Sequence, residues 1–287
     1  MHSFIQVASF IDKTLDNDPV SASKLFIQVS EKRLQYCILD GIAGRFTVLE
    51  DFRLEDGYAA GYQHLNALLA FLERLRLSYG AVIVLIEDPL STLVPYPLFE
   101  ESQKARYLEF TYDLPSQCLI LSDRLKNLEA VNVFAVPGEL HSLIIKYFPA
   151  CRIIHLATSL IEGLRATFRQ TELQGRVFVN VRSEYLDILV FDADKLIFCN
   201  SFPYHCREDF LYFLLFSMEQ LKLDPDKIPV TFMGDVLKNS PEYELSLKYV
   251  RNTSFISRNE RLHFSYVMND LPPHAYSHLF NLELCEL

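Results

Sequence analysis

The stretch RVFVNVRSEYLDILVFDADKLIFCNS, Arg176–Ser201, decides the fold of this chain. Three valines alternate with other residues in its first part, Arg176–Val181, which is the period of a strand with one buried face. A second alternating run, Leu186–Val190, and a third run, Leu196–Phe198, follow after short polar turns. The stretch therefore predicts three consecutive antiparallel strands.

A similar stretch lies about 150 residues earlier along the chain. It reads KLFIQVSEKRLQYCILDGIAGRFTVLE, Lys24–Glu50, with a short polar first turn at Ser30–Arg33 and Asp40-Gly41 at the second turn. A long apolar segment with helical spacing follows each stretch, at Gly57–Leu77 and Arg207–Leu223. A three-strand meander followed by a helix, occurring twice, predicts a duplicated α/β unit.

The charge balance excludes some classes of partner. The chain has 287 residues, of which half are hydrophobic, and 27 basic against 37 acidic residues give a net charge of −10. Because an acidic surface without basic clusters repels phosphate backbones and anionic lipids, we expect no nucleic-acid or membrane-surface binding.

The N-terminal sequence lacks the basic and apolar regions of a signal peptide. No run approaches about 18 unbroken apolar residues, so we expect no membrane span. Six cysteines are scattered without a C-x-x-C motif, as is typical of reduced thiols. These features predict a cytoplasmic protein.

The chain divides into three parts. Residues 1–20 include a polar run and are expected to form a loosely held lead-in, residues 21–172 the first half, and residues 173–287 the second half. The polar segment Thr171–Gly175 marks the expected boundary. In the first half, the apolar run Ala81–Ile86 reads as a strand buried on both faces, which is typical of parallel pairing.

An insertion at about residues 90–123 interrupts the first half. It contains two prolines, a helix candidate and a strand candidate, and we expect a small inserted subdomain. Its aromatic residues are candidates for contact with an unidentified protein partner, because aromatic patches of low charge suit protein interfaces. These candidates are Tyr96, Phe99, Tyr107 and Phe110.

The helix expected at Arg207–Leu223 contains seven consecutive apolar residues, FLYFLLF. A helix with one apolar stripe cannot bury them all, so we expect this helix to pack on two sides. Its segment Phe210–Met218 is a second candidate contact surface for a partner.

This order of elements resembles the actin-like ATPase superfamily, which includes actin, sugar kinases and Hsp70 chaperones. The segment Val131–Leu164, with a proline-started helix and a strand–helix pair, is similar to the actin-like protein of type IV pilus assembly. The chain also resembles an uncharacterised bacterial family with an actin-like ATPase fold. The resemblance covers about residues 24–256 and implies two βββαβα-type halves with a ribonuclease-H-like fold.

The phosphate-binding motifs of that superfamily are degenerate here. Each first turn carries D-x-G in the superfamily, where Asp orients Mg²⁺ or water and Gly admits the phosphates. The resemblance places these positions at Gln28 and Ser30 in the first half, and at Asn180 and Arg182 in the second. Gln and Asn are poor Mg²⁺ ligands compared with a carboxylate, although Arg182 is able to bind a phosphate.

The adenosine-contacting Gly-Gly pair of the superfamily aligns with Gly234 and Asp235, so one glycine is kept. The connector Leu223–Pro229 is short, whereas nucleotide-binding members commonly insert a whole subdomain there. The resemblance therefore implies a second half without its small inserted subdomain. Asp187 and Asp235 could lie near the former cleft, or be a solvated strand residue and a turn residue.

Other catalytic and metal-binding signals are weak. His274 and His278 have a helical i, i+4 spacing that can bind zinc, but no third ligand accompanies them, and an exposed helical face is the expected alternative. Cys199, His205 and Cys206 have no established ligand spacing. The P-loop, Rossmann and nucleophile-elbow motifs are all absent from the sequence. We expect neither a metal site nor catalytic residues.

We therefore expect a non-catalytic interaction or scaffold protein without a cofactor and of unknown oligomeric state. The alternative is a divergent ATPase or kinase that binds ATP with Mg²⁺ through altered contacts. Its nucleotide-binding residues would then be Ser30, Asn180, Arg182, Asp187, Gly234 and Asp235. A site for another small ligand is a third possibility, and the sequence names no such ligand.

Overall fold

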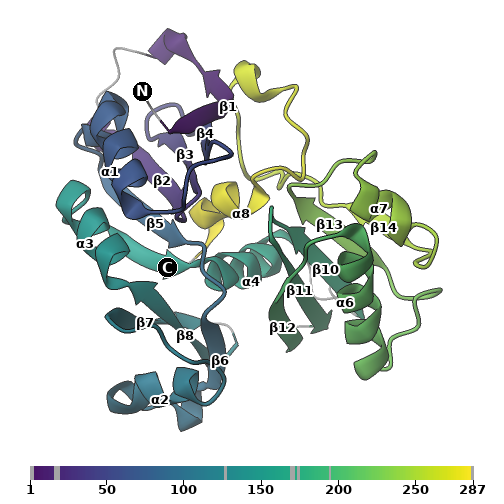
Figure 1. The fold of residues 1–287 in the computed structure, drawn as a ribbon. Coiled ribbons are helices and arrows are strands. Elements are labelled where there is room, and N and C mark those ends of the chain that lie inside the picture. The colour runs from purple at the N-terminus through teal and green to yellow at the C-terminus, as the bar shows by residue number, and fades with distance from the viewer. Residues whose placement is uncertain are drawn as a thin grey trace. The chain divides into compact units, whose positions relative to one another are not determined.

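The computed structural model describes residues 3–15, 20–125, 128–168, 172, 175–193 and 195–285 (Figure 1). These residues form two compact units. Unit 1 contains the chain up to Leu160 together with Glu260–Asp270, and unit 2 contains Ile161–Asn259 and Leu271–Cys285. The expected boundary at Thr171–Gly175 lies largely outside the described residues.

Unit 1 is built on a six-stranded sheet with the order β1-β4-β3-β2-β5-β9. Its strands are β1 (Phe4–Ile11), β2 (Lys24–Val29), β3 (Arg33–Asp40), β4 (Arg45–Leu54), β5 (Ala81–Ile86) and β9 (Arg152–His155). The expected antiparallel meander is confirmed as β2, β3 and β4, and β5 pairs in parallel with β2 and β9. Helices α1 (Tyr62–Phe71) and α3 (Gly138–Tyr147) bury apolar side chains in the core of this unit.

The expectation of a loose lead-in over residues 1–20 is wrong for β1. Phe4–Ile11 pairs antiparallel with β4 and shifts register between Gln6 and Ala8. Five of the eight residues are phenylalanine, isoleucine or valine, which favour strands, and Phe4 is buried in the core of unit 1. The polar run that suggested a lead-in begins only after this strand.

A three-stranded sheet forms the inserted subdomain of unit 1. Its order is β6-β8-β7, with β6 (Ser91–Pro95), β7 (Cys118–Leu125) and β8 (Ala130–Pro137). Helix α2 (Lys104–Glu109) packs its Leu108 against this sheet. The small sheet thus includes β8, which lies beyond the expected insertion at about residues 90–123.

Unit 2 is built on a five-stranded sheet with the order β12-β11-β10-β13-β14. Its strands are β10 (Arg176–Val181), β11 (Tyr185–Asp192), β12 (Lys195–Pro203), β13 (Val230–Gly234) and β14 (Thr253–Phe255). The expected meander is confirmed as β10, β11 and β12, while β13 pairs in parallel with β10 and β14.

Helix α6 (Arg207–Gln220) lies against the sheet of unit 2 (Figure 1). Phe210 and Leu214 are fully buried, whereas Tyr212 is 58% exposed and Phe216 40% exposed. Helix α6 thus contacts the sheet and also α7 (Pro241–Ser246), but its apolar run is not buried in full. The apolar run continues around the helix, but only one face has a sheet to cover it, and aromatic side chains remain on the other.

Three further helices complete the described residues. They are α4 (Leu156–Thr167), α7 (Pro241–Ser246) and α8 (Ser277–Phe280), with 3-10 turns at Lys13–Leu15, Val20–Ala22, Glu73–Arg76, Tyr96–Leu98, Glu101–Gln103, Tyr266–Met268 and Asn281–Leu284. The helix expected over Gly57–Leu77 is divided into α1 and a 3-10 turn. Among the described residues, no helix has the length and apolar character needed to cross a lipid bilayer.

Candidate functional site

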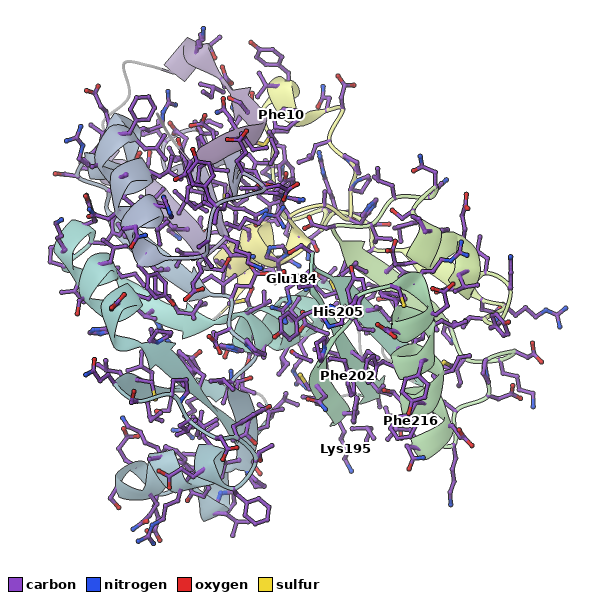
Figure 2. All side chains as sticks on the ribbon, viewed as in Figure 1. Phe10, Glu184, Lys195, Phe202, His205 and Phe216 are labelled. Carbon is purple, nitrogen blue, oxygen red and sulfur yellow. The ribbon has the colours of Figure 1, made fainter. Side chains whose placement is uncertain are left out.

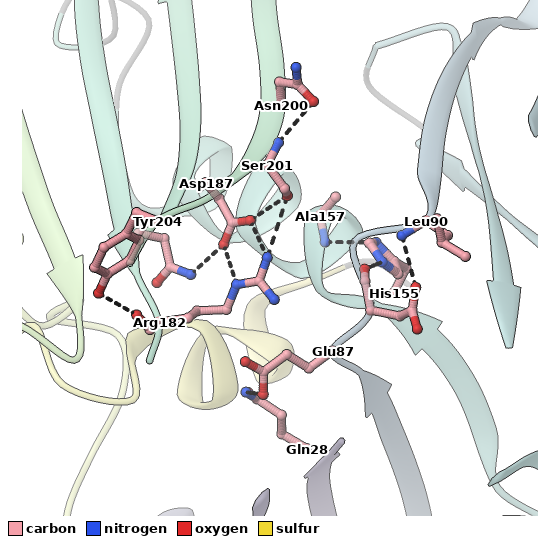
Figure 3. Close-up of polar contacts among 12 residues, drawn as sticks. Gln28, Glu87, Leu90, His155, Ala157, Arg182, Asp187, Asn200, Ser201 and Tyr204 are labelled. Carbon is pink, nitrogen blue, oxygen red and sulfur yellow. Dashed lines mark hydrogen bonds and ion pairs between the residues drawn. The ribbon is translucent and has the colours of Figure 1, made fainter. Parts of the chain in front are cut away.

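The residues aligned with the second phosphate loop form a polar row across unit 2 (Figure 3). Strand register places Asn180 of β10, Asp187 of β11 and Ser201 of β12 side by side. Asn180 Nδ2 donates to Asp187 Oδ2 over 2.8 Å, and Ser201 Oγ donates to Asp187 Oδ1 over 2.5 Å. The carboxylate of Asp187 is thus at the centre of the row.

Arg182, in the turn after β10, completes the contacts of this carboxylate. Its Nη2 lies 2.7 Å from Asp187 Oδ1 and its Nε 3.0 Å from Oδ2, a bidentate ion pair. Asp187 is only 4% exposed and Arg182 is also buried. Burial alone would raise the pKa of Asp187, but the charge and hydrogen bonds of Arg182 hold this pKa below its ordinary value. The expectation of a solvated Asp187 is therefore wrong.

Further contacts close the backbone around this row. Tyr204 donates its hydroxyl to the carbonyl oxygen of Arg182 over 2.7 Å. Gly234 has a φ of 84°, and a Cβ at this position would lie 2.4 Å from the carbonyl oxygen of Val181 and 2.7 Å from Asn180 Oδ1. Only glycine fits this contact. Asp235 is exposed, and its N–H donates to the carbonyl oxygen of Val181.

Unit 1 has a corresponding row of its own. Gln28 lies beside Gln35, and Gln35 beside Asp51, across β2, β3 and β4. Arg33 forms a bidentate ion pair with Asp51, at 3.0 Å from Oδ1 and 2.6 Å from Oδ2, and Gln35 Nε2 donates to Oδ2. Burial alone would raise the pKa of Asp51, but the hydrogen bonds and charge of Arg33 hold this pKa below its ordinary value.

The residues at the aligned loop positions of unit 1 contact different groups. Gln28 donates its amide nitrogen to Glu87 Oε2 over 2.8 Å (Figure 3). Ser30 closes the tight turn, since its N–H donates to the carbonyl oxygen of Arg33. In each unit the row therefore holds one buried aspartate, and an arginine already neutralises it.

These side chains do not fit Mg·ATP, the cofactor that the resemblance implies. A Mg²⁺ site needs carboxylate or water oxygens, but both oxygens of Asp187 accept hydrogen bonds from Arg182, Asn180 or Ser201. The side-chain oxygens of Gln28 and Asn180 are buried and have no donor among the described residues. As bare acceptors they repel phosphate oxygens.

Comparison with known proteins places the chain in a family. The family model described as "Protein of unknown function (DUF3822)" matches residues 12–253. The chain belongs to the DUF3822 family. No curated protein matches it.

Solved structures show the fold of this DUF3822 protein. It is similar to a protein of Bacteroides thetaiotaomicron with an actin-like ATPase fold and unknown function, at 20% identity and a TM-score of 0.74, over 83% of this chain and 91% of that chain. It is also similar to a chain of a PilM–PilN type IV pilus biogenesis complex, at 14% identity and a TM-score of 0.65, over 94% of this chain and 100% of that chain. The DUF3822 protein thus has the actin-like ATPase fold, as the order of its elements predicted.

The aromatic residues singled out in the insertion have different surroundings. Phe99 and Tyr107 stack on each other, and the Tyr107 hydroxyl donates to the carbonyl oxygen of Leu98, so both serve the packing of the subdomain. Tyr96 is half-exposed, with the guanidinium of Arg124 over its ring. Phe110 is 94% exposed. Only Tyr96 and Phe110 are thus largely available at the surface.

A groove in unit 1 was not predicted from the sequence of this DUF3822 protein. It has a volume of about 750 Å³ and lies between α1, the start of β7 and α3. Leu119, Leu143 and Lys146 are among its lining residues. Because residues from three distant segments form the groove, no local motif reveals it.

A buried polar cluster was also missed. The carboxylate of Asp123, on β7, accepts hydrogen bonds from the N–H of His155 at 2.9 Å and the hydroxyl of Thr158 at 2.8 Å. Asn132 donates to the same hydroxyl. Burial raises the pKa of Asp123 to about 6. Thr158 lies in the first turn of α4, which begins at Leu156.

The histidine pair is not an exposed helical face. His274 and His278 are both buried, and His274 Nε2 lies 2.5 Å from the carbonyl oxygen of Val236. Cys199 and Cys206 also differ in surroundings, since only Cys206 is exposed. No group of three histidine, cysteine or acidic residues that could hold a metal occurs in the part of the chain that the structure describes.

Proposed function

We propose that this DUF3822 protein is a non-catalytic actin-like protein that serves as a protein-interaction module. The observation that carries the proposal is the buried contact of Arg182 with Asp187 at the second phosphate-loop position. Catalysis of phosphoryl transfer rests on positioned Mg²⁺ and phosphates. A carboxylate already paired with arginine supports a different use of the fold.

The groove of unit 1 is the contact surface that the geometry favours. Beside it, β7 is an edge strand of the three-stranded sheet. The N–H of Gly138 donates to the carbonyl oxygen of Gln117, so Cys118 and Ile120 turn their backbone groups away from β8. An extended segment of a partner can add to this edge while its side chains enter the groove. The PilM–PilN complex supports partner binding as a use of this fold.

The first experiment is thermal unfolding of the full chain with and without millimolar Mg·ATP. We expect no change in Tm, because we propose that the chain does not bind the nucleotide. A nucleotide that did bind, at about 100 times its Kd, would add roughly 2.7 kcal/mol of stability and raise Tm clearly. A clear rise in Tm would favour the alternative, a divergent ATPase. That alternative further requires Arg182→Ala to abolish the rise without unfolding the chain.

The second experiment tests the groove. We expect the wild-type chain to retain a defined protein partner, and Leu119→Arg and Ser142→Arg to lose it, because both substitutions place a long cation in the groove. Ile42→Arg is the matched control on an exposed residue outside the groove and should retain the partner. Equal retention by all four proteins would contradict this location.

A further inference from the structure

The outer edge of β1 has no strand beside it in the described residues of unit 1. Glu55 N–H donates to the carbonyl oxygen of Ser3, and Asp12 N–H donates to that of Thr47. Along an antiparallel pair, every second residue directs its backbone N–H and C=O groups toward the neighbouring strand, and the residues between them direct these groups away from it. The two flanking bonds and the single register shift after Gln6 therefore show which residues of β1 direct their backbone groups away from β4. Backbone N–H and C=O groups of Phe4, Gln6, Ser9 and Ile11 point away from β4.

The edge strand of unit 2 shows how this protein protects an open edge. Just after β12, the N–H of Tyr204 donates to the carbonyl oxygen of Glu184. By alternation along the pair, the backbone groups of Ser201 and Pro203 therefore point away from β11. Pro203 has no N–H, and the N–H of Ser201 is covered by the side chain of Asn200 over 2.9 Å (Figure 3). Lys195 extends from the other end of the strand (Figure 2). Proline, lysine and covered amides are devices that prevent strand addition.

Strand β1 has neither a proline, a lysine nor an amide covered by a side chain, and its single irregularity is the register shift between Gln6 and Ala8. Its sequence FIQVASFI contains neither a charged residue nor a proline, although 22% of the chain is charged. Ile5 and Val7 are 47% and 45% exposed. Phe10 lies on the same strand (Figure 2). An apolar edge with free backbone groups readily accepts another strand.

The order of apolar and polar residues in β1 is the same when the strand is read in either direction. The order apolar, apolar, polar, apolar is followed by apolar, polar, apolar, apolar. Antiparallel pairing of two copies about an axis between Val7 and Ala8 places polar residues opposite polar ones and apolar opposite apolar. The pairs are Phe4 with Ile11, Ile5 with Phe10, Gln6 with Ser9, and Val7 with Ala8 of the second copy.

The outward groups agree with this register. Phe4 and Gln6 face outward at one end, and Ser9 and Ile11 face outward at the other, so each outward residue meets an outward residue. The side chains of Gln6 and Ser9 both bond to Glu50 and therefore share one face of the sheet. Paired residues in an antiparallel ladder also share a face.

The lack of charge favours a second copy over a foreign strand. A foreign strand can be selected by complementary charges along the edge, and β1 offers none. In self-pairing, a charged residue tends to meet like charge across the axis, which is destabilising. An uncharged strand avoids this repulsion in a chain whose net charge is −10.

We propose that β1 pairs antiparallel with β1 of a second copy, in the register given above, to form a two-fold symmetric dimer. The pairing would join two six-stranded sheets into one, and its contact is isologous. This inference does not depend on the proposed function, since β1 contributes no residue to the groove or to the polar rows.

The test is sedimentation equilibrium of the full chain from about 1 to about 200 µM, where mass action shifts a reversible dimer. We expect a monomer–dimer equilibrium in the wild-type chain. Gln6→Pro should raise the dimer Kd at least about tenfold, because it removes an outward N–H; it removes no backbone bond to β4, only the side-chain bond to Glu50. Val7→Lys should do the same by placing a charge at the axis.

Phe110→Lys is the control, since it places the same charge on an exposed residue outside β1. Hydrogen exchange checks the register. The amides of Gln6 and Ser9 should be protected at high protein concentration and exchange freely at low concentration. A wild-type chain that remains monomeric, a dimer that survives both β1 variants, or protection independent of concentration would overturn the proposal.

Discussion

At the scale of single residues, the two arginine–aspartate pairs explain how polar rows persist inside the sheets. A buried carboxylate is costly unless it is paired and hydrogen-bonded. Asp187 accepts hydrogen bonds from Arg182, Asn180 and Ser201. Asp51 accepts hydrogen bonds from Arg33 and Gln35. In both units the charge of the buried carboxylate is thus compensated within the chain.

The first residue-scale prediction concerns Arg182→Met. We expect a loss of about 3–5 kcal/mol in the free energy of unfolding, because Asp187 is left buried and unpaired. The double variant Arg182→Met with Asp187→Leu should recover most of this loss. Arg207→Met, at an exposed pair with Glu208, is the control and should change little. Urea unfolding measures all three.

The pH dependence of that loss follows from the lowered pKa of Asp187. A carboxyl group whose pKa is lower in the folded state stabilises the fold above its unfolded pKa of about 4. In Arg182→Met the carboxyl of Asp187 stays buried without its cation, so burial raises its pKa and the carboxyl takes up a proton as the pH falls. We expect the difference in unfolding free energy between wild type and Arg182→Met to be largest near pH 8, to narrow as the pH falls toward about 4, and to narrow further below this value. A difference that stays constant from about pH 8 to about pH 4 would contradict the assignment to Asp187.

The second residue-scale prediction concerns Asp123→Asn. The pKa of Asp123 is raised to about 6 in the folded state. Its buried charge therefore lowers stability above this pH, and the loss disappears as the pH falls toward about 4. An asparagine oxygen can accept the same two hydrogen bonds without the charge. We expect Asp123→Asn to be more stable than wild type by up to about 3 kcal/mol at pH 8 and equal to it near pH 4.

At the scale of elements, α6 shows what burial on one face implies. Phe210→Ala should destabilise the chain by about 3–5 kcal/mol, because a fully buried ring leaves a cavity in unit 2. Tyr212→Ala, two residues along the same helix, should change stability by less than about 0.5 kcal/mol. Comparable losses for both variants in thermal unfolding would mean that both faces of α6 are covered.

The elements also show how far the sequence predicts this fold. The strands β10 to β12 and β2 to β4 could be predicted because alternation and turn residues are local signals. The packing of α6 could not, since FLYFLLF does not encode how many layers cover a helix. The first strand was hidden by the polar run that follows it, and its pairing with β4 is decided by residues some forty positions away.

The candidate site could be predicted only in part. The aligned positions Gln28, Asn180 and Arg182 followed from the resemblance, and so did the loss of the D-x-G motifs. The pairing of Arg182 with Asp187 was not predicted, because a side chain in a turn and another on a strand show no mutual signal in sequence. The groove depends on residues from α1, β7 and α3 and has no signal at all.

At the scale of the whole molecule, net charge should govern self-association through β1. Two chains of net charge −10 repel each other at neutral pH. Because the proposed contact contains no charged pair, salt screens only this repulsion. We expect the dimer Kd to fall as salt rises from about 0.05 to about 0.5 M, over which the Debye length shortens several-fold. A Kd that rises with salt in sedimentation experiments would indicate a contact made by ion pairs.

The contacts around Asn180 couple the substitutions that this row of residues can accept. Asn180→Asp alone would set a second carboxylate against Asp187, and Arg182→Gly alone would leave Asp187 without its ion pair. Each of these single changes therefore lowers stability. The neighbouring contact of Gly234 with Asn180 adds a further constraint on size. Substitutions at these positions are thus epistatic, since the effect of a change at one residue depends on which residues stand at the others.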